Sequence, residues 1–309
     1  MIQPVLPTPS VLVCLAAYNG LNWLPEQLAS ILGQQDVAVS IVISVDKSTD
    51  GTEKWCDQIA LTDSRVTVLP HGACFGGAAR NFLRLLREVD IAPFDYLAFA
   101  DQDDIWFPDK LARAHALLRG EGADAYSSNV IAFWPDSREV LVQKAQPQVQ
   151  WDFLFEAAGP GCTYVLNKKL VYALQGVLIA NWQTAQEIGL HDWFVYAFAR
   201  ANGYRWLIDT QPGMRYRQHA TNQVGINAGW CAFFMRARRV LNGWGFNHAS
   251  LIARLIGFEH HEWVQRWVSG GRCGMLWLAL QARQCRRRPS DQLLFALSCI
   301  AVAIVGIRR

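Results

Sequence analysis

The segment YLAFADQDDIWFPDK, residues 96–110, joins a short apolar run to a cluster of carboxylates. Residues 96–100 have the length and composition of a buried strand, and Asp101, Asp103 and Asp104 follow them directly. Because charges near a buried element need partners, this cluster predicts a ligand or metal site. The strands that precede the segment indicate where that site lies.

Three more apolar runs, at residues 11–17, 39–45 and 65–69, alternate with helical patterns, and a further helix is expected over 108–119. This βαβαβαβα order predicts an α/β fold with a Rossmann-like, mainly parallel central sheet flanked by helices. Ligands of such sheets bind beyond the carboxyl ends of the strands. We therefore expect Tyr18-Asn19 and Asp46 to meet the acidic cluster there.

The pattern is looser after residue 120, where single elements are expected without a regular alternation. They are strands at 125–134, 139–143, 162–166 and 206–208, and a helix at 191–201. We expect a catalytic domain over residues 1–222 and a helical, Arg- and aromatic-rich region over residues 223–309.

The composition is that of a globular chain with a large core: 309 residues, 51% hydrophobic and 18% charged. The eight cysteines are scattered without a CxxC pair, which favours reduced thiols in a cytoplasmic protein over a disulfide framework or zinc site. The start, MIQPVLPTPS, lacks the pattern of a secretory signal. Residues 1–224 carry more acidic than basic side chains, which argues against a nucleic-acid partner.

The Asp-x-Asp spacing of Asp101 and Asp103 suits a hard divalent cation such as Mg²⁺ or Mn²⁺, which prefers oxygen ligands from carboxylates, water and phosphates. The alternative is an acidic loop that caps the helix beginning near Pro108, a role for which Asp104 and Asp109 are the better candidates. A second aspartate after another strand, Asp46, favours the metal and ligand site.

Taken in order, a set of short motifs resembles family 2 inverting glycosyltransferases of the GT-A fold, and most of all their bacterial rhamnosyltransferase-type branch. The resemblance covers about residues 10–222. The motifs are AAYNG (16–20), EQLASILGQ (26–34), SVDKSTDGT (44–52), DQDDIWFPDKL (101–111), GLHDW (189–193) and YRQH (216–219).

The resemblance implies a role for each matching residue on the donor side. Asp46 would bind the nucleobase of a nucleoside-diphosphate sugar, beside the edge formed by Ala17, Tyr18 and Asn19. Asp103 would hold the metal that bridges the donor diphosphate, with Asp101 on the ribose or a metal-bound water. The sequence departs from the family at Val45, where a second acid is usual, at Lys47, often a glycine, and at His191, often an acid.

Two basic groups are further donor-side candidates, each with a structural alternative. His219, supported by Arg217, would contact the diphosphate or the metal, or would be a histidine satisfied within a loop. Arg80, next to Gly76-Gly77, would reach the donor phosphates or would be a solvated helix charge.

The resemblance makes Asp192 the catalytic base, which must take the proton of the attacking acceptor hydroxyl. Asp192 opens the expected helix at 191–201, where the helix dipole favours an ionised carboxylate; a plain helix-start charge is the alternative. We expect Gly161 and Cys162 on the acceptor side, since glycine allows close approach of a ligand. Trp193 is a candidate for stacking on a sugar, although aromatic side chains more often belong to the core.

The last 85 residues, 225–309, hold 12 arginines against three acidic residues. Residues 293–307 carry no charge but are too few for a membrane-spanning helix, which needs about 20 apolar residues. We expect this region to lie on the inner face of the cell membrane, with arginines on anionic headgroups. The alternative is an ordinary helical subdomain that packs on the catalytic domain or in a homodimer.

Together these features predict a metal-dependent, inverting glycosyltransferase that is cytoplasmic and peripheral to the membrane. The branch resemblance implies transfer of rhamnose from dTDP-rhamnose to a lipid-linked or polysaccharide acceptor in cell-surface glycan synthesis. A nucleotidyltransferase of related fold should have a glycine-rich, basic phosphate loop after the first strand, and AAYNG is neither. A non-catalytic sugar- or membrane-binding protein should have lost Asp103 or Asp192, and both are present.

Overall fold

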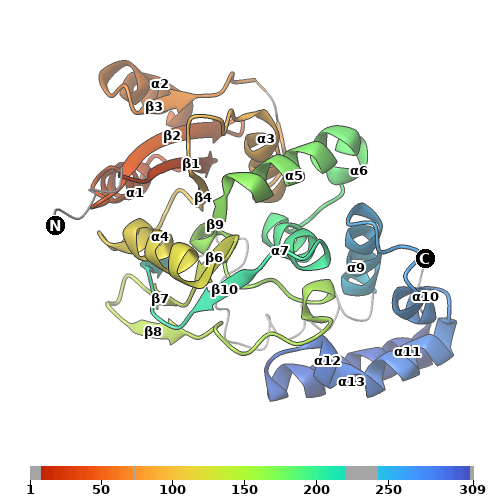
Figure 1. The fold of residues 1–309 in the computed structure, drawn as a ribbon. Coiled ribbons are helices and arrows are strands. Elements are labelled where there is room, and N and C mark those ends of the chain that lie inside the picture. The colour runs from red at the N-terminus through yellow and green to blue at the C-terminus, as the bar shows by residue number, and fades with distance from the viewer. Residues whose placement is uncertain (1–7, 73, 220–242, 307–309) are drawn as a thin grey trace.

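The computed structural model describes residues 8–72, 74–219 and 243–306 (Figure 1). Its first half alternates strands and helices in the predicted order. The elements are β1 (Ser10–Ala17), α1 (Leu24–Leu32), β2 (Ala38–Val45), α2 (Thr52–Thr62), β3 (Val66–Val68), α3 (Ala78–Glu88), β4 (Tyr96–Ala100) and α4 (Lys110–Glu121). The expected alternation is confirmed, with α4 beginning two residues after the expected start.

The central sheet has seven strands in the order β10-β6-β9-β4-β1-β2-β3. Its other members are β6 (Ala125–Ser128), β9 (Val165–Asn167) and β10 (Trp206–Asp209). Strand β9 is antiparallel to both of its neighbours, and the remaining pairs are parallel. The prediction of a mainly parallel sheet is therefore confirmed.

Side chains of β1 alternate between two apolar cores, one on each face of the sheet. Val11, Val13 and Leu15 pack into the core that contains α1 and α4, whereas Leu12 and Cys14 pack into the core that contains α3 and later helices. A strand covered on both faces must be apolar at every position, which is why residues 11–17 form a continuous apolar run.

The prediction of one strand at 125–134 was wrong, because this segment forms two strands that belong to two different sheets. β6 ends at Ser128, and β7 (Val130–Phe133) joins a second sheet of order β5-β11-β7-β8, with β5 (Ile105–Trp106), β8 (Glu139–Val142) and β11 (Met214–Arg217). Asn129 makes the break: its side chain donates to the Thr210 carbonyl at 2.6 Å and accepts from the Lys144 N–H at 2.6 Å. Buried polar groups of this kind replace the ladder bonds that the chain loses between sheets.

Between β8 and β10 the structure contains two 3₁₀ turns and two helices that the sequence patterns did not predict. Cys162, expected in a strand, is in the short 3₁₀ turn η2 (Gly161–Thr163), and another such turn, η1 (Asp152–Leu154), precedes it. Helices α5 (Lys168–Ala180) and α6 (Trp182–Ala185) follow β9, and α7 (His191–Ala201) lies where a helix was expected.

Five helices make up the described part of the C-terminal region: α9 (Trp244–Leu255), α10 (Glu262–Val268), α11 (Gly271–Leu280), α12 (Ala282–Cys285) and α13 (Pro289–Val305). Figure 1 shows α9 beside α7, and α11 to α13 at the end of the molecule away from β3. Their buried side chains, such as Phe246, Trp267 and Phe295, belong to the same core cluster as α3 and α7. The expected boundary at 222/223 lies outside the described residues. None of the helices described is long and apolar enough to cross a membrane.

Candidate active site at the carboxyl edge of the sheet

Strands β1, β2 and β4 end side by side, which brings together the residues that follow them. Leu15 pairs with Ala100 and Ala17 with Val45, so the segments starting at Tyr18, Asp46 and Asp101 leave one edge of the sheet. The Gln102 side chain joins two of them, accepting from the Tyr18 N–H at 2.8 Å and donating to the Tyr18 carbonyl at 2.9 Å. The predicted meeting of these segments is confirmed.

Asp46 is buried, and its carboxylate organises the loop that faces it. Oδ1 accepts from the main-chain N–H of Lys47 and of Phe75, both at 2.9 Å, and Oδ2 accepts from that of Gly76 at 3.0 Å. Asp46 therefore fixes residues 75–76 against the end of β2. Any contact with a nucleobase would use the lone pairs that these bonds leave.

Asp103 lies beside His219, which comes from the far end of the predicted domain. The His219 Nε2 and Asp103 Oδ2 atoms are 2.6 Å apart, and both side chains keep a small exposed surface. Trp23 stacks on the His219 ring with centroids 4.3 Å apart. Arg217 pairs with Glu26 and donates from Nε to the Asp103 carbonyl at 2.7 Å. DQDD and YRQH thus form one structural unit.

Asp101 and Asp104 complete the acidic group around Asp103; Asp104 is fully buried, whereas Asp101 is half-buried. Burial and the neighbouring Asp103 charge raise the pKa of Asp101 to about 7, and the same two causes, in that order, raise the pKa of Asp104. Asp104 Oδ1 accepts from the Arg217 N–H at 3.2 Å, while Oδ2 is buried without a hydrogen-bond partner among the described residues. The repulsion among these carboxylates is the condition that a bound cation would relieve.

A buried lysine, Lys110, lies close to this acidic group. Lys110 donates from Nζ to the Cys162 carbonyl at 2.7 Å and lies over the Trp106 ring at 3.2 Å. Burial lowers its pKa to about 7, against the attraction of Asp104 and Asp101. Lys110 therefore ties the acidic loop to the turn η2.

The donor set fits a hard divalent cation through its oxygen atoms. Ligand atoms of Asp101, Asp104 and Cys162 lie within 4.8 Å of one another, and Asp103 with His219 lies next to them. Burial raises the pKa of the Cys162 thiol well above its usual range, so this sulfur stays protonated and is a poor ligand for Mg²⁺ or Mn²⁺. Asp101 and Asp103 could hold the ion through their carboxylate oxygens, and the His219 ring nitrogen lies beside Asp103.

Asp192 lies in the first turn of α7, against the turn η2. A Cβ atom on Gly161 would be 3.2 Å from the Asp192 Cβ and 2.5 Å from His191 Nε2, so only glycine allows this contact. Burial raises the pKa of Asp192 to about 6, although the Trp193 N–H at 2.8 Å and Lys144 oppose the shift. A carboxylate with such a pKa is suited to general-base work near neutral pH.

His191 is a packing residue in this structure. Its ring stacks on Phe82 at 4.1 Å and meets Phe99 edge-on, and burial lowers its pKa to about 3. It is therefore neutral at physiological pH. Its ring contacts with Phe82 and Phe99 support the start of α7, next to Asp192.

Two other predicted site residues are engaged in structural contacts. Trp193 is buried against His248 and donates from Nε1 to the Phe153 carbonyl at 3.0 Å, so of the two possibilities its ring belongs to the core and does not face a sugar. Arg80 donates from Nε to the Gln186 carbonyl at 2.8 Å and from Nη1 to the Phe75 carbonyl at 3.3 Å. Both groups connect segments around the site.

Several residues of the site were missed by sequence reasoning. They are Trp23, Gln27, Gln102 and Lys110. Gln27 is fully buried and donates to the Asp101 carbonyl at 3.0 Å. All but Trp23 lie within the quoted motifs, and an uncharged residue inside an acidic motif, such as Gln102, was the available signal.

The family model described as Glycosyl transferase family 2 matches residues 12–159. The dTDP-rhamnosyl transferase RfbG of Shigella flexneri is 45% identical over 287 residues, which cover 93% of this chain and 99% of that protein. The chain belongs to glycosyl transferase family 2. The predicted family and the predicted glycosyltransferase activity are therefore confirmed.

Solved structures share the fold of this family 2 glycosyltransferase at low sequence identity. TarS of S. aureus, in complex with UDP-GlcNAc, has a TM-score of 0.53 at 13% identity and covers 95% of this chain and 89% of that one. A mannosyltransferase of Pyrobaculum calidifontis, in complex with GDP-Man and Mn²⁺, has a TM-score of 0.50 at 17% identity and covers 95% and 86%. The fold is the GT-A-like α/β fold that was predicted.

Proposed function

We propose that this glycosyltransferase moves rhamnose from dTDP-rhamnose to a glycan or glycolipid acceptor, with inversion and with Mg²⁺ or Mn²⁺ as cofactor. The observation that supports the proposal is the contact of His219 with Asp103, beside Asp101 whose pKa the Asp192 charge helps to raise, in a chain 45% identical to a dTDP-rhamnosyl transferase. The identity supports the donor, and the carboxylates support the chemistry.

The protein's residues have separable tasks in this reaction. Asp46 and the 75–76 loop would position the nucleobase, and Asp101, Asp103 and His219 would hold the cation. When bound, the cation supplies charge stabilisation to the departing dTDP. Asp192 would take the proton of the acceptor hydroxyl as that oxygen attacks the anomeric carbon from the side opposite dTDP, and a single displacement of this kind inverts the configuration.

We also propose that the protein works in the cytoplasm, on the inner face of the cell membrane, where a lipid-linked acceptor would be found. Helix α13 supports this, since Leu293, Leu297 and Ile304 on one side of it are 63%, 53% and 71% exposed. Leu276 and Leu280 extend the apolar surface onto α11, which packs against α13. We call Leu276, Leu280, Leu293, Leu297, Ile300 and Ile304 the apolar stripe.

Charge around the apolar stripe favours a lipid surface over a second copy of the chain. Arg272 begins the exposed side of α11 and Arg283 is exposed on α12. The region from 225 onward has 12 arginines and three acidic residues, which suits anionic headgroups and would repel a like-charged copy. A homodimer through this surface is the competing outcome.

A donor panel tests the proposed activity. The full chain, with Mg²⁺ or Mn²⁺, would be incubated with dTDP-rhamnose, UDP-glucose, UDP-GlcNAc and GDP-mannose, and release of the nucleotide by slow hydrolysis would be measured. We expect dTDP-rhamnose to be bound most tightly and hydrolysed fastest. Preference for another nucleotide sugar would overturn the donor assignment, and equal rates in EDTA would overturn the metal assignment.

A further inference from the structure

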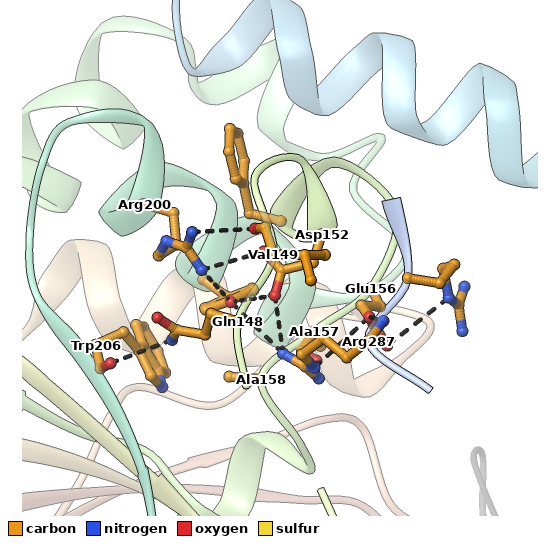
Figure 2. A network of polar contacts seen from close by, with 12 residues as sticks. Gln148, Val149, Asp152, Glu156, Ala157, Ala158, Arg200, Trp206 and Arg287 are labelled. Atoms are coloured by element: carbon orange, nitrogen blue, oxygen red, sulfur yellow. Dashed lines mark hydrogen bonds and ion pairs between the residues drawn. The ribbon is translucent and has the colours of Figure 1, made fainter. Parts of the chain in front are cut away.

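A buried polar cluster joins the C-terminal region to the elements that carry Asp192 (Figure 2). Its members are Asp152 of η1, Glu156, Tyr196 and Arg200 of α7, and Arg287, which follows α12. The side chains of Asp152 and Arg287 are 0% and 2% exposed. Ionised groups so completely buried persist only when each is paired, so this cluster holds its segments in one arrangement.

Arg287 contacts three parts of the predicted catalytic domain, namely the turn η1, residues 156–157 and helix α7. Its guanidinium donates to the Ala157 carbonyl at 2.6 Å and lies 3.4 Å from Asp152 Oδ2, and its main-chain N–H donates to Glu156 at 2.7 Å. It also lies 3.5 Å from the Tyr196 hydroxyl, one helical turn after Asp192 on α7. Figure 2 shows Arg287 reaching from the C-terminal segment between Ala157 and Asp152.

Asp152 connects Arg287 to α7, because its carboxylate also bonds to two side chains of that helix. Its Oδ2 accepts from the Tyr196 hydroxyl at 2.8 Å, and its Oδ1 pairs with Arg200 at 3.1 Å. Trp193, the neighbour of Asp192, donates to the carbonyl of Phe153 in the same turn η1. The start and middle of α7 are thus both fixed to η1.

A second connection between Arg287 and Asp192 runs through the segment that follows Ala157. Residues 157–161 end at Gly161, whose α-carbon lies so close to Asp192 and His191 that no side chain would fit. The Ala158 N–H is fixed by the Tyr164 hydroxyl at 3.0 Å. Arg287 therefore holds both sides of the contact between η2 and the start of α7.

We propose that Arg287 is a positioning residue for Asp192, so that the C-terminal helices complete the acceptor side of the site. The inference rests on the proposed role of Asp192 as the base. The donor side is built from β1, β2 and the acidic loop, none of which Arg287 contacts in the described structure. Loss of Arg287 should consequently affect the chemical step much more than donor binding.

The test compares three full-length variants with the wild-type chain. Arg287→Met removes the charge at similar length, Arg287→Lys keeps the charge but lacks the fork that reaches two acceptors, and Arg119→Met changes an exposed arginine of α4. Affinity for dTDP with Mg²⁺ would be measured by calorimetry. The rate of dTDP release from dTDP-rhamnose would give the chemical step, and amide hydrogen exchange would report local order.

We expect Arg287→Met to lower the rate of dTDP release roughly 10- to 100-fold, as misplacement of a reacting group does, with dTDP affinity within about twofold of wild type. Arg287→Lys should fold normally and lose less of the rate, and Arg119→Met should match wild type. Amides of residues 156–161 and 191–196 should exchange faster in Arg287→Met, with those of β1 and β2 unchanged.

Two results would overturn the proposal. One is a wild-type rate and wild-type exchange in Arg287→Met. The other is parallel loss of dTDP affinity and rate in Arg287→Lys, which would make Arg287 a general stability residue. If wild-type protein releases no dTDP, the proposed function fails, while the exchange measurement still decides whether Arg287 orders the start of α7.

Discussion

Asp192 is the residue on which the proposed chemistry depends. Asp192→Asn removes the proton acceptor while keeping its shape, so transfer should fall by roughly 10²- to 10⁴-fold. Affinity for dTDP, measured by calorimetry with Mg²⁺, should stay unchanged because Asp46 and Asp103 remain. Full transfer by this variant would show that another group is the base.

The raised pKa of Asp192 sets the pH dependence of the reaction. Its pKa of about 6 lies above that of an ordinary aspartate, so Asp192 gains a proton, and the base is lost, as pH falls through 6. We expect kcat to drop about tenfold per pH unit below this point. A pH series of initial rates, with dTDP affinity measured alongside, checks this. A kcat that stays flat down to pH 5 contradicts the assignment.

Gly20 controls the contact between two donor-side segments. A Cβ atom at this position would lie 2.2 Å from Gln102 Oε1, so Gly20→Ala must displace the side chain that bonds both main-chain groups of Tyr18. Loss of two hydrogen bonds should raise the donor KM roughly 3- to 10-fold, with a smaller effect on kcat.

The control for this substitution is Gly176→Ala, because a Cβ atom on Gly176 in α5 would meet nothing within 4 Å. Steady-state kinetics on both variants give the comparison. An unchanged KM in Gly20→Ala would mean that the Tyr18 segment does not position the donor.

At the scale of single elements, α13 has two faces with different tasks. Phe295, Cys299 and Val302 are buried in the main core, whereas Leu293, Leu297 and Ile304 of the apolar stripe are exposed. Deletion of α13 would damage the core, so substitutions on the outer face are the cleaner test of membrane binding.

The triple variant Leu293→Gln, Leu297→Gln, Ile304→Gln should bind vesicles of phosphatidylglycerol at least 100-fold more weakly, since each apolar side chain contributes about 1 kcal/mol or more when it leaves water. Leu61→Gln on α2, 87% exposed at wild type, is the matched control. Cosedimentation with vesicles measures binding, and added salt should weaken it. Dissociation of a dimer in the triple variant, with vesicle binding intact, would assign the stripe to a subunit interface.

At the scale of the whole molecule, the shared core predicts one cooperative unit. Side chains of α9 to α13 pack in the same cluster as α3 and α7, and Arg287 pairs with Asp152 in the catalytic half. We expect a single unfolding transition in urea, coincident by far-UV circular dichroism and tryptophan fluorescence. A chain cut at residue 243 should not fold. Two separated transitions, or a folded and dTDP-binding fragment 1–242, would show two independent domains.

Local sequence pattern determined the first half of the fold and its site. The apolar runs at 11–17, 39–45 and 96–100 predicted their strands because strands buried on both faces have no polar positions, and parallel order then placed Asp46 and Asp101 at one edge. The motifs, as an ordered set that resembles the family, predicted Asp103, His219 and Asp192 as members of one site, and the structure places His219 against Asp103.

Only the tertiary structure decided how distant segments complete that site. Nothing in the run 283–288 distinguishes Arg287, which is buried on Asp152, from Arg283, which is exposed, because the difference depends on which segment packs against α12. The same holds for Trp193, which is buried against His248, and for the break at Asn129 between two sheets. Pairing and burial of polar groups depend on contacts between residues far apart in the chain, and a local pattern does not contain them.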